Sequence, residues 1–361
     1  MLHNKCGHAR KNMKKEKIAI IGIGCIFPDA PDFTEYWRNI IETKDSVRDI
    51  SGLFWDKADY YDENPKARDM HYCTMGATVD PIEFDSMEFG ISPKVMESTS
   101  VEQLFALIAA RQALIDAGMY GENAKEFNRK KTGVILSAPI GKNAFYLCNR
   151  TVAPKLRKIL RNNGVPEEVI ERVVERYLDS FCEWSEDSNP GYIANVVAGR
   201  IANRFDLGGT SCCVDAACGS SLASLKFAVD ELQNGNCDVM LTGGANLDSS
   251  EFSYISFCKT PAISKTHQIK PFDEKADGMI LGDGVGIIVL KRLSDAQRDH
   301  DSIYAVIQSV GSSSDGKAKS IYAPSKDGQT RALRDAYEKA DVSPDTVGLI
   351  EAHGTGTAAG D

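Results

Sequence analysis

The fold of this protein is organised around residues 211–230, which read Ser211-Cys-Cys-Val-Asp-Ala-Ala-Cys218-Gly-Ser-Ser-Leu-Ala-Ser-Leu-Lys-Phe-Ala-Val-Asp230. Residues 211–215 are typical of a short buried strand, and from residue 220 the apolar positions 222, 225, 229 and 232 recur at helical spacing. Asn234-Gly235 then marks the end of the helix. Residues 216–219 have small side chains, and this tight connection places Cys218 at or just before the first helical turn.

This position favours a reactive form of the Cys218 thiol. A helix N-terminus favours an anion, because its backbone N–H groups are unpaired and the positive end of the helix dipole lies there. A free cysteine has a pKa of about 8.5, and helix N-termini lower it. The sequence therefore predicts a thiolate nucleophile. The alternative is a buried structural cysteine, the usual role of a free Cys.

Composition limits the classes of function. At 361 residues the chain can bury a large core, as one domain or two halves. A net charge of -9 argues against a nucleic-acid partner. No run has the apolar length of a membrane span, and the basic, polar start is not a secretory signal, so we expect a disordered lead-in over residues 1–16. The 10 cysteines and 6 histidines lack the common zinc spacings, so no metal is expected, and reduced thiols point to a cytosolic (cytoplasmic) enzyme.

The rest of the chain alternates strands with helices. Strands are expected at 17–24, 132–137, 238–244, 285–292, 303–310 and 347–351. Helices are expected at 101–117, in the core, at 154–162 and 167–181, as an inserted surface hairpin, and at 329–340, capped by Asp327. This order predicts an α/β protein with mostly parallel sheets. The glycine turn after the first strand has no third glycine and no helix start, which argues against dinucleotide binding.

A second reactive centre follows the last expected strand, in the run Glu351-Ala-His353-Gly-Thr355-Gly-Thr357. The glycines allow close approach of a ligand to the backbone, and the threonine hydroxyls can bond an amide-bearing arm. His353 can polarise a carbonyl or take a proton near neutral pH. Cysteine plus histidine leaves two classes open, acyl transfer through a thioester and hydrolysis as in cysteine proteases. The very apolar helices fit a buried site reached by a flexible carrier arm better than an open peptide cleft.

Several runs of the chain together resemble the β-ketoacyl synthases (ketosynthases) of the thiolase superfamily. The matching runs are residues 18–27, 89–93, 214–218, 270–273 with 276–278, 284–292 and 351–357 with 360–361. A narrower likeness, to the iterative ketosynthases of polyunsaturated-fatty-acid, heterocyst-glycolipid and enediyne synthases, depends on residues 195–207, residues 319–324 and the helical insert before Asn195.

This resemblance implies a thiolase-like, layered αβαβα fold with two similar halves, usually as a homodimer. It gives Cys218 the role of acyl acceptor from the phosphopantetheine arm of an acyl carrier protein, the only cofactor group expected. A malonyl thioester on a second carrier would then lose carbon dioxide and attack the acyl group. His353 would bind the malonyl carbonyl, Thr355 and Thr357 would line the pantetheine channel, and the backbone N–H of Cys218 would form half of an oxyanion hole.

The chain departs from the family pattern at several places. Gly219 stands where the family commonly has serine, and Gly282-Asp283-Gly284 replaces its Gly-Glu-Gly. The family's second histidine, its lysine and its glycine-phenylalanine loop have no counterpart, so we expect a C-terminally truncated domain. Residues 17–300 would form the N-terminal half, with a helical insert at about 142–190, and residues 301–361 the start of the second, incomplete half. Two alternatives remain: an inactive ketosynthase-like fragment that binds a carrier or partner protein, and a thiolase-type enzyme using coenzyme A.

Overall fold

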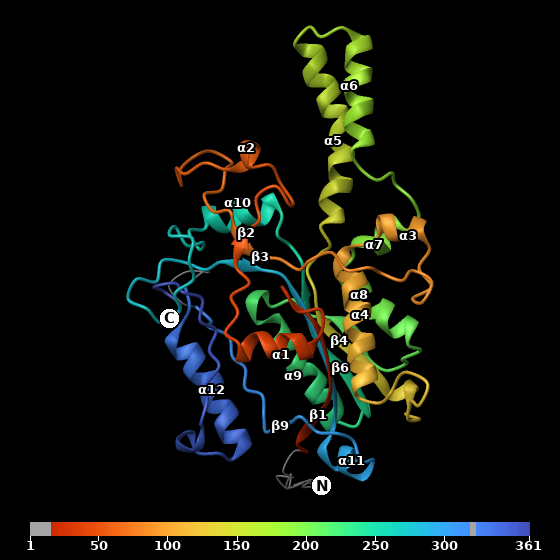
Figure 1. The fold of residues 1–361 in the computed structure, drawn as a ribbon, viewed down its shortest axis with the longest axis vertical. Helices are drawn as coiled ribbons and strands as arrows, with labels where there is room; N and C mark the ends of the chain where they lie inside the picture. The colour runs from red at the N-terminus through yellow and green to blue at the C-terminus, as the bar shows by residue number, and fades with distance from the viewer. Residues whose placement is uncertain (1–15, 318–322) are drawn as a thin grey trace, which may run out of the picture.

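A mixed six-stranded sheet forms the centre of the computed structural model, which describes residues 16–317 and 323–361 (Figure 1). Its order is β5 (Ser211–Cys213), β4 (Thr132–Ser137), β6 (Val239–Asn246), β8 (Gly284–Arg292), β1 (Ile18–Ile26) and β9 (Ala305–Ile307). β5, β4 and β6 are parallel, whereas β8, β1 and β9 each run antiparallel to their neighbours. The expectation of mostly parallel strands is therefore wrong for half of the sheet, because an alternation of strands and helices does not encode strand direction.

Helices cover both faces of this sheet. α4 (Val101–Asp116) and α8 (Asn195–Arg204) pack on one face, and α9 (Ser220–Gln233) packs on the other. Along β4, Val134 and Leu136 belong to the α4 core and Ile135 to the α9 core, as the two-residue period of a strand requires. α4 is buried on nearly all sides, which confirms the predicted core helix. The described residues thus supply an α–β–α portion of the expected αβαβα layers.

The helix after Cys218 follows the predicted apolar stripe except at its start. Val229 and Leu232 are buried and Leu225 packs against the same core, whereas Leu222 is 66% exposed. The first turns of α9 place small residues against the sheet, and the hydroxyl of Ser224 donates a 2.9 Å hydrogen bond to the carbonyl of Gly243. The helix ends where expected, since its last residue is Gln233 and Gly235 adopts a left-handed φ of 73°.

Three other expectations are wrong in detail. β5 is a half-buried edge strand with Ser211 exposed, not a buried strand. α12 (Lys326–Ala340) is capped by the Ser325 hydroxyl, which accepts from the N–H of Gly328, and not by Asp327. The strand at 347–351 is absent: Leu349 and Ile350 are 85% and 75% exposed, because no described strand pairs with this segment.

The inserted helices form a hairpin that projects from the body (Figure 1). α5 (Asn143–Asn162) begins well before the predicted residue 154 and contains Pro154, and α6 is Glu167–Asp179. The smaller elements are η1 (Arg129–Lys131), η2 (Ala217–Gly219), η3 (Pro344–Thr346), α1 (Phe33–Ile41), α2 (Lys57–Tyr60), α3 (Pro93–Ser98), α7 (Ser188–Tyr192), α10 (Glu251–Lys259), α11 (Leu293–Arg298), and a three-stranded sheet of β2 (Arg48–Asp49), β3 (Met75–Ala77) and β7 (Leu281–Gly282). Within the part of the chain that the structure describes, no helix combines the length and the apolar character needed to cross a bilayer.

Candidate active site

Cys218 lies in a strained turn between β5 and α9. It is the middle residue of the 3₁₀ turn η2, directly before α9, as the sequence predicted. Ala217 adopts a left-handed φ of 49°, a conformation that costs a non-glycine residue about 1–2 kcal/mol. The carboxylate of Asp215 accepts from the N–H of Ala217 at 3.0 Å, and the Ser220 hydroxyl donates to the Ala217 carbonyl at 2.6 Å. These bonds hold the turn in a shape that leaves Cys218 exposed.

The Cys218 side chain lines a cavity of about 700 Å³. Its wall combines apolar groups with polar side chains, of which four lie at or just after strand ends and one in α10, namely Ser137, Asp215, Asn246, Asp248 and Ser253. Open α/β sheets bind ligands beyond the carboxyl ends of their strands, and β4, β5 and β6 all end at this cavity. A thiol exposed in such a cavity can accept an acyl group from a ligand that reaches it.

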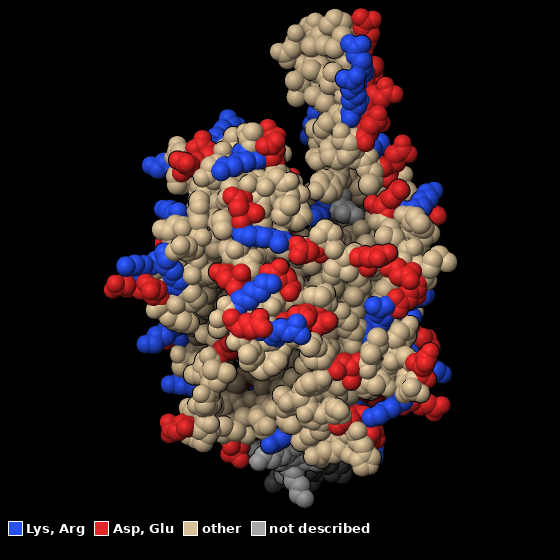
Figure 2. All heavy atoms as spheres, viewed as in Figure 1, with Lys and Arg blue, Asp and Glu red and all other residues tan. Residues whose placement is uncertain are grey.

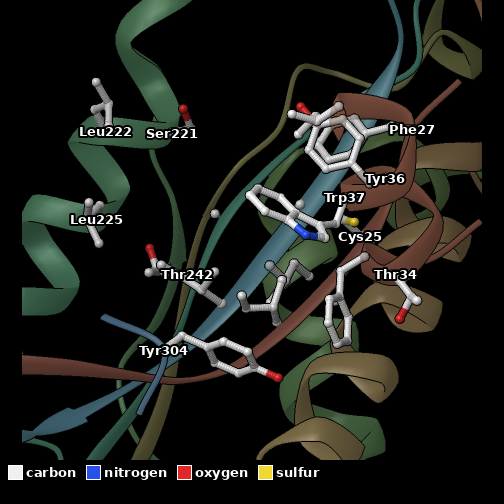
Figure 3. Close-up of a pocket in the computed structure, with 18 residues that line it drawn as sticks. Cys25, Phe27, Thr34, Tyr36, Trp37, Ser221, Leu222, Leu225, Thr242 and Tyr304 are labelled. Carbon is white, nitrogen blue, oxygen red and sulfur yellow. The ribbon is translucent and has the colours of Figure 1, made fainter. Parts of the chain in front are cut away.

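An apolar hollow of about 880 Å³ adjoins this cavity and shares Phe27, Ser221, Gly243 and Gly286 with it. Figure 3 shows Leu222 and Leu225 of α9 on one side of the hollow and aromatic side chains of α1 on the other. The thiol that lines this hollow belongs to Cys25, and burial raises the pKa of that thiol to about 12. A protonated thiol is a poor nucleophile, so of the two thiols that line these cavities Cys218 is the candidate nucleophile.

His353 is not among the residues that line the Cys218 cavity. It is exposed, in a loop that packs on residues 270–278: Gly278 N–H donates to the Gly356 carbonyl at 2.8 Å, and Asp361 accepts from Phe272 N–H at 2.9 Å. Residues 270–278 lead into Leu281 and Gly282, which do line the Cys218 cavity. The sequence predicted that a strand at 347–351 would position His353, and this strand is absent. The approach of His353 to Cys218 therefore stays a prediction.

Thr355 and Thr357 lie in the same loop as His353. Their hydroxyl oxygens are 2.9 Å apart, within hydrogen-bonding distance of each other. The Asp361 carboxylate also accepts from the N–H of Gly356 at 3.0 Å. The loop is thus internally bonded, and its threonines are outside the lining of the Cys218 cavity, so their role in a pantetheine channel remains a prediction.

Sequence reasoning missed several residues around the thiol. Phe27 and Asp248 line the Cys218 cavity, and both follow strands, the one signal that could have found them. Asp283 lies behind the cavity wall, where burial raises its pKa to about 6, while the Ser249 hydroxyl at 3.0 Å and the charge of Lys142 oppose that shift. Among residues 16–317 and 323–361, no group of His, Cys, Asp and Glu has the arrangement of a metal site.

Comparisons with known proteins identify the family of this chain. Residues 15–296 match the family described as β-ketoacyl synthase, N-terminal domain, and residues 304–361 match its C-terminal domain. The chain is 42% identical, over 96% of its length, to a polyunsaturated fatty acid synthase of a Thraustochytrium species, and 32% identical to polyketide synthase PksN of Bacillus subtilis. It covers only 12% and 6% of those two proteins.

Solved ketosynthase structures have the same fold. An oxazolomycin ketosynthase domain of Streptomyces albus JA3453 superposes with a TM-score of 0.80 at 28% identity, covering 96% of this chain and 54% of that one. The ketosynthase of module 6 of the Bacillus subtilis bacillaene synthase gives 0.76 at 32% identity, covering 96% and 52%. The likeness therefore covers nearly all of this chain and about half of each solved one. Both family matches, the shared fold and the strand-to-helix turn of Cys218 lead to one conclusion: this chain belongs to the β-ketoacyl synthase family.

Proposed function

We propose that this chain is a decarboxylating ketosynthase domain that holds its acyl group on Cys218, a carbon–carbon bond-forming acyltransferase of fatty-acid or polyketide synthesis. The observation that carries the proposal is the exposed thiol of Cys218, presented by a strained turn into a cavity with polar and apolar walls. Strain at a nucleophile is retained where the surrounding structure fixes it, and here two side chains do so.

The proposed reaction has two steps. In the first, Cys218 sulfur attacks an acyl thioester on the phosphopantetheine arm of an acyl carrier protein, a thioester forms at Cys218, and the pantetheine thiol leaves with the proton. In the second, a malonyl thioester loses carbon dioxide, and its carbanion attacks the acyl carbonyl. The carbon–carbon bond forms as the carbon–sulfur bond to Cys218 breaks, which leaves the product on the carrier and regenerates the enzyme thiolate.

The backbone around Cys218 suits the negative charge of the intermediate. The N–H of Cys218 donates no hydrogen bond within the described residues, so it is available to an oxyanion. One such donor contributes about 10²–10³ in rate. We assign the enolate-binding role to His353 and the pantetheine contacts to Thr355 and Thr357. Support for this comes from their Gly-Thr-Gly-Thr context and from the bonds that join their loop to residues 270–278.

We also propose where the protein is located and how it assembles. We place the protein in the cytosol, because Cys25, Cys73 and the other described cysteines are unbonded thiols. We propose a homodimer, for which the edge strand β5 offers unpaired backbone groups.

A mass-spectrometric assay separates this function from a binding-only module. The purified chain is incubated with an acyl thioester and its intact mass is measured; we expect one acyl adduct, located at Cys218, that Cys218→Ala abolishes. Release of carbon dioxide from a malonyl thioester is followed in parallel and should fall in His353→Ala, with acylation retained. An unmodified wild-type chain that still binds carrier protein would show that the chain is the binding module instead.

A further inference from the structure

The projecting hairpin of α5 and α6 is a small structural unit with its own core. Ala153 of α5 packs against Ile170 and Val174 of α6. The hydroxyl of Tyr177 donates to the Asn149 carbonyl at 3.1 Å, and Arg150 donates to the carbonyls of residues 178 and 181. The hairpin can therefore hold its shape while most of its surface faces away from the body (Figure 1).

Paired charges occupy one side of this hairpin. Arg157 makes two hydrogen bonds of 2.9 Å to Glu171, and Arg161 pairs with Glu167. Figure 2 shows these acidic and basic groups gathered along one side of the projecting hairpin, with uncharged surface beside them. Because each arginine is neutralised by its partner, this side offers little net charge to a ligand.

The opposite side is apolar. At about 100° per residue, positions i, i+4 and i+7 share a face of α5, and i and i+4 share a face of α6. On both helices these residues lie on the side away from the ion pairs. They are Val152, Leu156, Ile159, Val169 and Val173, which we call the hairpin face. Leu156 packs partly against the hairpin core. Ile159 is 58% exposed and Val152 and Val173 are each 40% exposed, so these three side chains are open to solvent.

Basic residues border the hairpin face on both helices. By the same spacing, Lys155 lies beside it on α5, and Arg176 and Arg172 lie beside it on α6. All three are exposed, and none forms a salt bridge with any described residue. Glu167 and Glu171 are engaged on the other side, and by the same spacing Glu168 and Glu175 lie farther from the face than Arg172 and Arg176. The side chains that border the face directly are therefore basic, on a chain whose net charge is -9.

We infer that the hairpin face docks an acidic amphipathic helix of a partner protein. A third helix laid along the groove between α5 and α6 would cover the exposed aliphatic groups and complete a three-helix bundle. Acidic residues on both flanks of that helix would meet Lys155 on one side and Arg172 and Arg176 on the other. A second copy of this chain fits less well, because two such faces would bring like charges together at their borders.

Fluorescence anisotropy tests this with a defined probe. The probe is a fluorescein-labelled synthetic helix of about 20 residues, with leucines at i, i+3, i+4 and i+7 and glutamates on both flanks. The matched control peptide replaces every glutamate with lysine. We expect the full chain to bind the acidic helix, to bind the basic helix at least about tenfold more weakly, and to lose affinity as salt rises from about 50 to about 500 mM.

Paired variants locate the binding to the hairpin face. Ile159→Glu and Val173→Glu should each raise the Kd about tenfold or more, and Arg172→Glu with Arg176→Glu should raise it several-fold. Lys158→Glu, a charge reversal on the same helix away from the face, should leave the Kd within about twofold. Circular dichroism checks that each variant keeps its helices.

Three results would overturn the inference. They are no binding of the acidic helix, equal binding of both peptides, and binding that Ile159→Glu leaves unchanged. Sedimentation velocity tests whether a second copy of this chain binds the hairpin face instead. Self-association that Ile159→Glu abolishes would assign the face to a second copy. Since Cys218 is not involved, loss of acyl transfer in Cys218→Ala leaves this test unaffected.

Discussion

The Ser220 hydroxyl donates a 2.6 Å hydrogen bond to the backbone carbonyl of Ala217, the residue whose left-handed φ of 49° precedes Cys218. The same hydroxyl oxygen accepts from the N–H of Ala216 at 2.7 Å. A single side chain at the start of α9 therefore holds the two residues that precede Cys218 in the turn. Its position explains how a strained backbone persists at the surface while presenting a thiol.

Removing that hydroxyl should loosen the turn. We expect Ser220→Ala to lose about 1–2 kcal/mol of stability in urea unfolding, because two partly buried hydrogen bonds are lost, and to slow acylation of Cys218. Ser221→Ala is the matched control, since the Ser221 hydroxyl makes no hydrogen bond within the described residues. Equal stability and equal acylation rates in the two variants would contradict the role given to Ser220.

Acylation should be selective for one cysteine. Burial raises the pKa of Cys73 and of Cys213 to about 11, so these thiols should stay unmodified. Cys148 and Cys182 are exposed like Cys218 but do not line its cavity. In a variant with Cys148, Cys182 and Cys6 (which lies outside the described residues) changed to serine, peptide mapping after treatment with an acyl thioester should find the adduct at Cys218. Acylation spread equally over the exposed thiols of the wild type would contradict a dedicated site.

Two glycines near the site should differ in how much stability they lose when changed to alanine. Gly243 has a φ of 149°, and a Cβ there would lie 1.9 Å from the Gly286 carbonyl oxygen, so Gly243→Ala should cost more than about 3 kcal/mol or prevent folding. Gly219 has an ordinary φ of -87° and nothing within 4 Å of an added Cβ, so Gly219→Ala should cost less than about 1 kcal/mol. Urea unfolding measures both. A large loss at Gly219 would mean that the nucleophile turn tolerates no side chain there.

Asp283 should make stability fall as pH rises. Burial raises its folded pKa to about 6 from an ordinary value of 3.8, so between these values the folded state binds the proton and the unfolded state releases it. The penalty is absent below about pH 4 and reaches on the order of 3 kcal/mol above about pH 6. Asn keeps an oxygen acceptor for Ser249 but cannot ionise. Asp283→Asn should therefore gain stability relative to wild type from about pH 4 to about pH 7, and a pH-independent difference would refute this account.

Asp361 should hold the His353 loop against residues 270–278. Its carboxylate accepts from Phe272 and Gly356, so Asp361→Ala should release both amides. Hydrogen exchange should then speed up at these two N–H groups and stay unchanged in β4, which lies in the buried sheet core. Asp361→Asn retains one acceptor oxygen and should show a smaller effect. Unchanged exchange at Phe272 would mean that the loop is held by other contacts.

Periodicity and turn residues predicted the elements that need only local information. The core helix α4, strand β4 and the end of α9 at Asn234 lie where the sequence placed them, because apolar spacing and glycine act within a few residues. The exposure of Leu222 at the start of α9 could not be read the same way. There the close approach of the helix to Gly243 places Ser224 against the sheet, and Leu222 and Leu225 line the apolar hollow.

The sequence by itself determined the family, the strand-to-helix turn and the identity of its thiol, because these depend on residue types in fixed order along one short segment. Only the tertiary structure decided that half of the sheet is antiparallel, that Leu349 and Ile350 stay outside it, and that Asp361 and Phe272, 89 residues apart, are hydrogen-bonded. Those features depend on which segments meet in space, and pairing across such distances depends on the packing of the whole chain.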